Sequence, residues 1–299
     1  MDRFAGMSVF VKTVEHGSFT AAADALNMSP QLVAKQIQKL EEHLGVRLLH
    51  RTTRRQSVTD FGRSFYDRAK SILLEVEMAE NLAAETRGVP TGRLRINAQV
   101  TYGLHILAPR LPEYFKAYPK VAVEFTLTNR DVYLIEEGYD AIFRTGEPSD
   151  SGLIARPLAP YPMVLCAAPS YLAGRPAIRT PWDVQQHECL GSAFTEMRRK
   201  WTFDGPDGRV VVPISSRLVF DNGETQLCAA LAGTGLMLQP LALAQAALDD
   251  GRLVVVLPDY PPPSRAVHVY YAADRRVTPK LNSFLDFVVK ALGPSAKID

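Results

Sequence analysis

The spacing of apolar residues predicts three short helices near the N-terminus, at residues 4–16, 19–26 and 30–44. In each of them apolar residues recur every three or four positions, as one buried face of a helix requires. Gly17 and Gly45 suit a left-handed C-cap and predict where two of the helices end. Ser18 and Ser29 are favoured N-caps, and a proline follows Ser29 at the first helical position. The pattern therefore predicts a first helix followed by two helices joined by a tight turn.

The third helix separates a buried stripe from a polar face. The stripe consists of Val33, Ile37, Leu40 and Leu44, and the polar face consists of Gln31, Lys35, Gln38 and Glu42. Side-chain amides can pair with adenine, and cations can pair with guanine or phosphate. The polar face therefore has the chemistry of a recognition helix in the DNA major groove. An ordinary solvated face is the alternative, because amphipathicity by itself explains the same pattern.

An alternating spacing of four and three residues predicts one long helix over residues 63–87. Its apolar positions are Phe65, Ala69, Ile72, Val76, Ala79, Ala83 and Thr86. A helix of this length spans about 37 Å. With no domain of its own to pack on, the stripe is expected to pair with a second copy of itself and so form a dimer. An ordinary core helix is the alternative. Gly88, Pro90 and Gly92 predict its end.

Beyond residue 90 the pattern alternates between short apolar strands and amphipathic helices. Strands are expected at residues 94–98, 121–127, 139–143, 163–167, 210–212, 218–220, 236–239, 253–257 and 267–272. Helices are expected at residues 103–118, 132–137, 224–232 and 279–292. This alternation is typical of an α/β fold with a mostly parallel sheet.

Composition narrows the class of protein. The chain has 299 residues, of which 46% are hydrophobic and 22% are charged, so it is expected to fold into two or three globular domains rather than remain disordered. Cys166, Cys189 and Cys228 are an odd number without zinc-ligand spacing, which argues against a disulfide framework and fits a reducing compartment. No apolar run approaches the roughly 20 residues of a membrane span, and no secretory signal is seen. We therefore expect a cytoplasmic protein without a membrane partner.

Positive charge is concentrated in one short segment. Five arginines against the single acid Asp60 lie between residues 44 and 63: Arg47, Arg51, Arg54, Arg55 and Arg63. The net charge of the whole chain is only +2, so this local excess is the informative feature. A segment of this kind is suited to a polyanion such as DNA.

The sequence lacks the common motifs for catalysis and cofactor binding. The chain has no GxGxxG, GxxxxGK[ST], HExxH or GxSxG motif, and its six histidines lack metal-ligand spacing. We therefore predict no catalytic residue, no metal and no cofactor. A redox sensor built on Cys189 and Cys228 is conceivable, but no basic flank indicates a lowered thiol pKa.

Three runs resemble the LysR-type transcriptional regulators: GSFTAAADAL at 17–26, QIQKLEEHLG at 36–45 and VRLLHRTTR at 46–54. The resemblance covers essentially the whole chain. It implies a winged helix-turn-helix domain at 1–62, a linker and dimerisation helix at 63–90, and an effector domain at 91–299. That domain would have the two-lobed periplasmic-binding-protein architecture, with lobe one at about 91–162 and 268–299 and lobe two at about 163–267.

The resemblance also implies which residues meet DNA. Pro30, Gln31, Ala34 and Lys35 occupy the positions that enter the major groove, and Arg54 occupies the wing position. The full predicted set is Ser29, Pro30, Gln31, Ala34, Lys35, Gln38, Arg51, Thr53, Arg54 and Arg55. Ala34 and Lys35 replace a serine and an arginine that are common in the family, so the operator sequence cannot be taken from relatives. For Arg51, a structural brace is the alternative.

A small-molecule cleft is expected where strands lead into helix N-termini, because free backbone N–H groups attract anions there. The predicted effector residues are Gln99, Val100, Thr101, Tyr102, Phe143, Arg144, Thr145, Ser192, Phe194, Asn222 and Met237. Arg144 can clamp a carboxylate with two hydrogen bonds, or instead form a salt bridge with Asp140 or Glu136. For Thr101, the alternative to a ligand contact is a helix cap. For Met237, the alternative is packing in the core.

Together these features predict a DNA-binding transcriptional regulator that binds a pseudo-palindromic promoter site and responds to a small effector, for which an organic acid is the expectation. Its expected partners are promoter DNA, further copies of itself in a dimer or tetramer, and RNA polymerase. One alternative is a cytoplasmic small-molecule-binding protein whose N-terminal domain serves assembly only. Another is an enzyme that acts on the cleft ligand. The sequence does not distinguish activation from repression.

Overall fold

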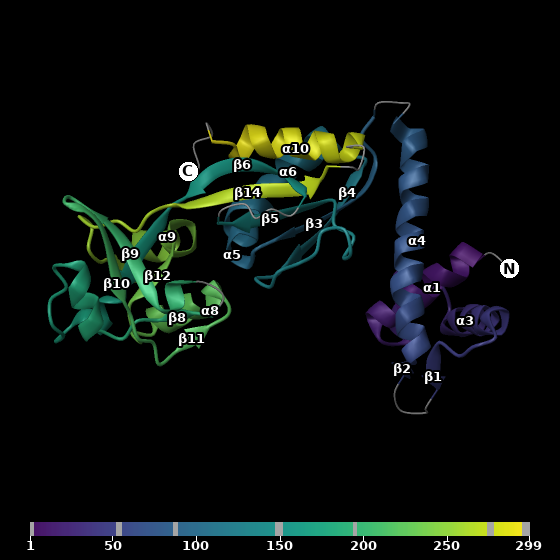
Figure 1. The fold of residues 1–299 in the computed structure, drawn as a ribbon, viewed down its shortest axis with the longest axis horizontal. Helices are drawn as coiled ribbons and strands as arrows, with labels where there is room; N and C mark the ends of the chain where they lie inside the picture. The colour runs from purple at the N-terminus through teal and green to yellow at the C-terminus, as the bar shows by residue number, and fades with distance from the viewer. Residues whose placement is uncertain are drawn as a thin grey trace. The chain divides into compact units, whose positions relative to one another are not determined.

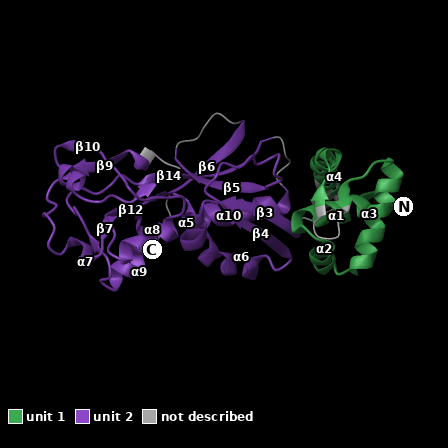
Figure 2. Cartoon of the chain, turned by 90° about the horizontal axis from the view of Figure 1, so that it is seen from below, with its two compact units in different colours: residues 1–88 green, residues 89–299 purple. Residues whose placement is uncertain are grey.

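The computed structural model describes residues 3–51, 56–85, 89–146, 152–193, 196–273 and 278–294. The chain forms two compact units, residues 1–88 and 89–299 (Figure 2). The finer boundaries expected at residues 62 and 90 stay predictions. Across the described ranges, no helix combines the length and apolar character that a membrane span needs.

The N-terminal unit contains four helices and a two-stranded hairpin. They are α1 (Arg3–His16), α2 (Phe19–Leu26), α3 (Pro30–Leu44), β1 (Leu49–Arg51), β2 (Gln56–Val58) and α4 (Asp60–Glu85). The predicted N-caps are confirmed, since the Ser18 hydroxyl accepts from Ala21 N at 3.1 Å and the Ser29 hydroxyl from Leu32 N at 3.2 Å. Gly45 closes α3 in the left-handed region, with φ 68°. The three predicted N-terminal helices are therefore confirmed.

The first half of α4 packs on α1 of its own chain, which corrects part of the dimerisation prediction. The Phe65 ring lies 5.7 Å from the Phe10 ring, between centroids, and Ala69 is completely buried. Phe65 packs against the core of the N-terminal unit, and Ala69 is inaccessible to a partner, because other residues of its own chain cover it. Ile72 is 41% exposed and Val76 is half-buried. The side chain of Ala79 lies outside the described residues.

The first lobe of the C-terminal unit is built on a mixed sheet with the strand order β4-β3-β5-β14-β6. The strands are β3 (Gly92–Ala98), β4 (Val121–Leu127), β5 (Ala141–Thr145), β6 (Leu153–Tyr161) and β14 (Arg265–Ala272). β3 runs parallel to β4 and β5, whereas β14 runs antiparallel to β5 and β6. Helix α10 (Pro279–Leu292) lies along one face of this sheet (Figure 1).

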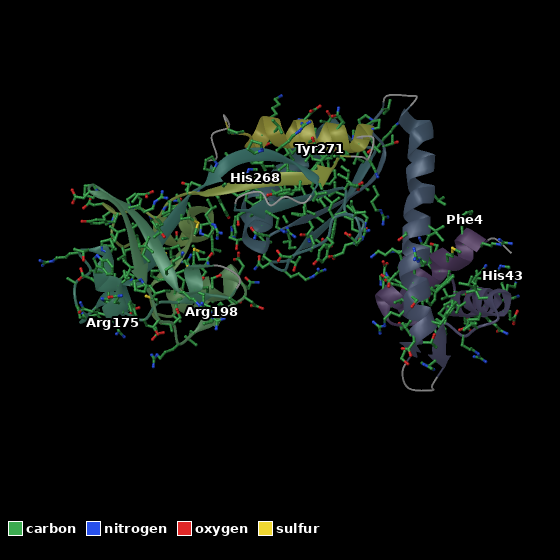
Figure 3. The ribbon with its side chains drawn as sticks, in the orientation of Figure 1. Phe4, His43, Arg175, Arg198, His268 and Tyr271 are labelled. Carbon is green, nitrogen blue, oxygen red and sulfur yellow. The ribbon has the colours of Figure 1, made fainter. Side chains whose placement is uncertain are left out.

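Two side chains of β14, those of His268 and Tyr271 (Figure 3), contact the segments beside the strand. The Tyr271 hydroxyl accepts from Arg156 Nε of β6 at 2.9 Å. A ring nitrogen of His268 lies 3.2 Å from the carbonyl oxygen of Gly146, the residue after β5. Since β6 and β14 both lead into the second lobe, these contacts fix the strands that connect the two lobes (Figure 1).

The second lobe has its own core and its own sheets. β7 (Met163–Ala167) pairs antiparallel with β12 (Met237–Pro240) and β13 (Val254–Val255). β8 (Gly191–Ser192) runs parallel to β11 (Val219–Phe220), and β9 (Lys200–Gly205) forms a hairpin with β10 (Gly208–Pro213). The helical segments are α7 (Pro169–Leu172), η3 (Pro181–Gln186), η4 (Glu196–Arg198), α8 (Gly223–Leu231) and α9 (Leu241–Asp249).

Several predicted elements differ in the structure. The helix expected at 103–118 is present but irregular, and its hydrogen-bond pattern changes along four consecutive helical segments: α5 (Val100–Tyr102), the π-helix η1 (Gly103–Leu107), the 3-10 helix η2 (Ala108–Arg110) and α6 (Leu111–Ala117). Pro109 and Pro112 lack the N–H groups that one continuous helix would use. Residues 132–137 form turns rather than a helix, because the Glu137 side chain accepts from Tyr133 N and pairs with Arg130.

The sheets also depart from the mostly parallel arrangement expected, since β14 and β7 both run antiparallel to their neighbours. Strand β6 was not predicted, because Pro157 and Pro160 interrupt its apolar pattern. β6 tolerates these prolines at the edge of its sheet, where one side of the strand has no ladder to complete.

Candidate functional site

Helix α3 exposes the polar face that the sequence predicts for DNA contact. Ser29, Pro30, Gln31, Lys35 and Gln38 are exposed, and Ala34 is half-buried. The opposite stripe of Val33, Ile37 and Leu40 is almost completely buried. On the exposed face, Gln38 Nε2 donates to Glu42 Oε1 at 2.9 Å. The helix therefore presents two amides and a cation to solvent from one rigid surface.

A buried carboxylate connects α3 to the hairpin, and sequence reasoning missed it. Glu41 is 7% exposed, and its Oε1 accepts from the backbone N–H groups of Leu48 at 2.9 Å and Leu49 at 3.1 Å. The spacing from Val33 through Ile37 to Glu41 puts the carboxylate on the buried face, which was the available signal. Glu41 therefore fixes the start of β1 against the recognition helix.

Most of the predicted wing contacts fall outside the described part of the chain. Thr53, Arg54 and Arg55 lie outside the described residues. The backbone of Arg51 is in β1, but its side chain is not described. Their contacts with DNA stay predictions.

The two lobes of the C-terminal unit enclose a cavity of about 560 Å³, here called the interlobe cavity. Seven of the predicted effector residues line it: Gln99, Thr101, Tyr102, Arg144, Thr145, Ser192 and Asn222. Further lining residues that the sequence did not single out include Asn129, Asp131, Tyr133, Met197, Phe220, Gln239 and Arg265. Tyr133 was not predicted as a lining residue, because its segment was expected to form a helix.

Of the predicted effector residues that the structure describes, three do not line this cavity. Phe143 and Met237 are 1% and 0% exposed and belong to the cores of the two lobes, so core packing is the correct interpretation of Met237. The backbone N–H of Val100 donates to Asn129 Oδ1 at 3.1 Å, and Val100 does not line the cavity. Phe194 lies outside the described residues.

Thr101 is not a helix cap. The N-cap residue of α5 is Gln99, and no side chain makes the capping bond there. Gln99 instead uses its Oε1 atom to accept from the backbone N–H of Thr145 at 3.1 Å and from its hydroxyl at 2.7 Å. The ends of β3 and β5 are therefore joined beside the cavity, and the Thr101 side chain faces the start of α8 at Gly223.

Arg144 has neither of the salt bridges considered for it. Its Nη1 donates to the carbonyl oxygen of Phe143 and its Nη2 to Asn97 Oδ1, both at 2.7 Å. Asp140 accepts from the backbone N–H of Arg95 instead. Burial lowers the pKa of the Arg144 guanidinium, and the nearby Asp131 carboxylate opposes that shift. A half-buried cation with uncharged hydrogen-bond partners therefore lines the cavity.

Two tyrosines lie deeper in the same region. The rings of Tyr102 and Tyr161 meet edge to face, with centroids 5.4 Å apart, and both residues are nearly completely buried. Among the described residues, neither hydroxyl has a hydrogen-bond partner. Burial raises the pKa of both phenols, so they stay protonated at neutral pH.

Contacts between the lobes border the cavity. His105 Nε2 lies 2.9 Å from Glu224 Oε1, and Asn129 Nδ2 donates to the carbonyl oxygen of Asp221 at 2.7 Å. Asn222 caps α8 by accepting from Glu224 N at 2.8 Å. The first turn of α8 is therefore connected to the first lobe.

The cysteines do not form a reactive pair. Burial raises the pKa of the Cys166 and Cys189 thiols to about 12, whereas Cys228 is exposed. A thiol is a nucleophile only as the thiolate, so Cys189 is a poor partner in the redox pair considered above.

Family models match both parts of the chain. The model described as "Bacterial regulatory helix-turn-helix protein, lysR family" matches residues 4–63. The model described as "LysR substrate binding domain" matches residues 87–293. The first match covers the polar face of α3, and the second covers the two lobes that line the interlobe cavity.

The relatives that match over most of their length include both a repressor and an activator. An HTH-type transcriptional repressor of Pseudomonas aeruginosa is 34% identical over 302 residues, covering 100% of this chain and 95% of the relative. The HTH-type transcriptional activator AaeR of Escherichia coli is 32% identical, covering 97% of this chain and 95% of the relative. The solved structure of CrgA, a LysR-type transcriptional regulator from Neisseria meningitidis, has 32% identity and a TM-score of 0.61, covering 96% of this chain and 97% of that chain.

Proposed function

Because the chain belongs to the LysR family of DNA-binding transcriptional regulators, we propose that it binds a pseudo-palindromic promoter site as a homo-oligomer and responds to a small organic acid in the interlobe cavity. The observation that carries the proposal is the exposed polar face of α3 opposite its buried stripe. A regulator of this kind communicates with RNA polymerase at the promoter. The matching relatives are regulators, and we propose no turnover of the effector.

On DNA, base contacts belong to α3 and phosphate contacts belong to the wing. Gln31 and Gln38 can pair with adenine, and Lys35 can reach guanine or phosphate. Ala34 can offer only a methyl contact, for example to thymine. Arg51, Thr53, Arg54 and Arg55 supply affinity and salt dependence more than sequence choice.

The assembly follows from symmetry. Two copies of α3 related by a twofold axis bind two half-sites, so the operator has dyad symmetry. The exposed part of α4 around Ile72 is the proposed pairing surface. Two dimers on one longer site would form the tetramer.

The effector belongs to the class of small organic acids. Arg144 supports this assignment, because a guanidinium whose hydrogen-bond partners are neutral can take a carboxylate through two parallel bonds. A cavity of about 560 Å³ is within the usual range for a small-molecule site.

A salt titration tests the DNA part. Duplexes retained by the purified full-length protein from a random-sequence library serve as the probe, and the affinity is measured against salt concentration. We expect log affinity to fall steeply with log salt. Lys35→Ala with Arg54→Ala should weaken binding and flatten the slope by about 2 to 4, because each copy in a dimer loses two positive charges.

The matched control removes two positive charges elsewhere. Lys116 and Lys120 are exposed in the C-terminal unit, and Lys116→Ala with Lys120→Ala should leave the slope unchanged. Unchanged affinity in the Lys35 and Arg54 double variant would refute the assigned reading face. Binding without salt dependence would favour the alternative that the N-terminal domain serves assembly only.

A further inference from the structure

A completely buried amide lies directly behind Arg144. Asn97 is in β3, is 0% exposed and does not itself line the interlobe cavity. Its Oδ1 accepts from Arg144 Nη2 at 2.7 Å, and its Nδ2 donates to Thr126 Oγ1 at 2.9 Å. The Thr126 hydroxyl lies 3.0 Å from the hydroxyl of Tyr139. Three strands and a turn therefore contribute to one hydrogen-bonded chain that ends at the guanidinium.

The hydrogen-bond chemistry permits only one orientation of this amide. A guanidinium has donors and no acceptor, so the amide oxygen must face Arg144 and the amide nitrogen must face Thr126. Buried polar groups with complete hydrogen bonding hold a side chain in one place. The long Arg144 side chain is thus fixed at the cavity wall.

The chemical type of Asn97 is as important as its position. An aspartate at this site would have the same shape but would form an internal ion pair with Arg144. A carboxylate already paired with a guanidinium leaves little charge for a ligand. An amide holds the guanidinium and leaves its charge uncompensated. Asp131, the acid with the largest effect on the pKa of Arg144, is exposed and makes no ion pair with it among the described residues.

We propose that Asn97 is a positioning residue that gives the interlobe cavity its preference for anionic over neutral effectors, acting through Arg144. This inference rests on the proposed function, in which that cavity is the effector site. Asn97 does not line the cavity itself, so it contributes to the preference for a carboxylate by holding Arg144 in place.

The walls of the cavity indicate what the carboxylate is attached to. Tyr133 is 70% exposed and Ile135 is 49% exposed on the first lobe, and both line the cavity. Met197 and Phe220 line it from the second lobe. Apolar groups on both lobes suit a ligand with an apolar body, so the effector class is a monocarboxylic acid with an aromatic or similar apolar body.

The test compares acids with their neutral isosteres. Benzoate, phenylacetate and cinnamate are each titrated into the full-length protein by calorimetry, alongside benzamide, phenylacetamide and cinnamamide. We expect the unmodified protein to bind at least one acid about tenfold or more tightly than its amide, because only the acid makes a charge-assisted bidentate pair. In Asn97→Asp this ratio should fall to about 1, with the affinity for the amide nearly unchanged.

A second variant separates positioning from simple structural support. Arg144→Gln should also bring the ratio to about 1, and Asn97→Asp with Arg144→Gln should lose no further discrimination than Arg144→Gln alone. A purely structural role of Asn97 would instead lower the affinities for acid and amide together. If Asn97→Asp fails to fold, Thr126→Val, which removes the partner of the Asn97 amide nitrogen, should lower the ratio in the same direction.

The outcomes distinguish the two levels of the argument. If the unmodified protein prefers an acid and both Asn97→Asp and Thr126→Val keep that preference, the role of Asn97 is overturned while the effector class stands. If none of the three acids binds more tightly than its amide, both the effector class and this inference are overturned. The salt titration with DNA tests the regulator separately from either result.

Discussion

At the scale of the residue, single buried polar groups determine where the functional surfaces are held. Glu41 joins α3 to β1, and Asn97 joins β3 to Arg144. Each is buried with its hydrogen bonds made, which is the condition under which a buried polar group stabilises one geometry. Both are placed behind the residues that would touch a ligand, so substitutions there should act indirectly.

The Glu41 carboxylate gives a direct prediction. Glu41→Gln keeps the shape but replaces two charge-assisted bonds from Leu48 and Leu49 with weaker ones, and it should lower the free energy of unfolding by about 1–2 kcal/mol. Urea denaturation measures the change, and operator affinity should fall with it because the start of β1 is held less firmly against α3. The control Glu42→Gln alters the next residue, which is exposed, and should change the free energy of unfolding by less than about 0.5 kcal/mol. Equal effects of the two substitutions would contradict the assignment.

The thiols give a second prediction. The pKa values of Cys166 and Cys189 are raised to about 12 by burial, so the folded protein should react with a thiol reagent at pH 8 only through Cys228. Unfolding in denaturant should release the other two thiols. As the pH rises above the ordinary thiol value, the unfolded chain loses protons that the folded chain keeps, so stability should fall in alkali. Rapid reaction of two thiols in the folded protein would show that one buried thiol is accessible.

At the scale of the element, helix α4 has two roles along its length. Its first turns pack on α1 through Phe65, Ala69 is buried, and Ile72 follows as an exposed apolar residue. The heptad spacing predicts one continuous stripe and does not show where the stripe passes from its own chain to a partner. That division depends on the position of α1 relative to α4, which is a tertiary contact that a local sequence pattern does not predict.

Charge placed on the exposed part of α4 should weaken the dimer. Ile72→Glu removes about 1.5–3 kcal/mol of apolar burial from each copy, so the dissociation constant of the dimer should rise at least about tenfold. Sedimentation at a series of protein concentrations measures the change. Ser71→Glu puts the same charge on the neighbouring exposed position and should have a much smaller effect. An unchanged dissociation constant for Ile72→Glu would place the pairing surface elsewhere.

Local signals account for what the sequence predicts well at this scale. Ser18, Ser29 and Gly45 act within three or four residues of their own helices, and those helix ends were predicted correctly. Contacts between distant strands could not be predicted in the same way. Arg144 and Asn97 are 47 positions apart, and they meet because β5 pairs with β3. Sequence reasoning therefore found Arg144 as a candidate and missed the amide that holds it.

At the scale of the whole molecule, the C-terminal unit is two cores connected by paired strands. The cores of the lobes are separate apolar clusters, and β6 and β14 run between them as antiparallel neighbours. A unit built in this way can change the angle between its lobes without disturbing either core. The contacts that cross the cavity border then set the balance between closed and open forms.

The hydrogen-bonded contact between His105 and Glu224 is one of these, and its exposure limits how much it can contribute. The two side chains are 31% and 34% exposed, so the pair is worth at most about 1 kcal/mol. Glu224→Gln should therefore shift the lobes toward an open form and weaken effector binding by no more than about fivefold. Hydrogen exchange of the backbone around η1 and α8, which the contact joins, should become faster.

The exchange measurement separates lobe closure from ligand contact, because it is made without any ligand. Glu113→Gln changes an exposed acid on α6 and should leave the exchange of both segments as it was. A loss of effector affinity far beyond fivefold in Glu224→Gln would mean that this carboxylate does more than hold the lobes together. A contact between two side chains that are about one-third exposed cannot account for such a loss. Faster exchange confined to α8 would instead indicate that Glu224 stabilises its own helix, where it occupies the first turn beside the Asn222 cap.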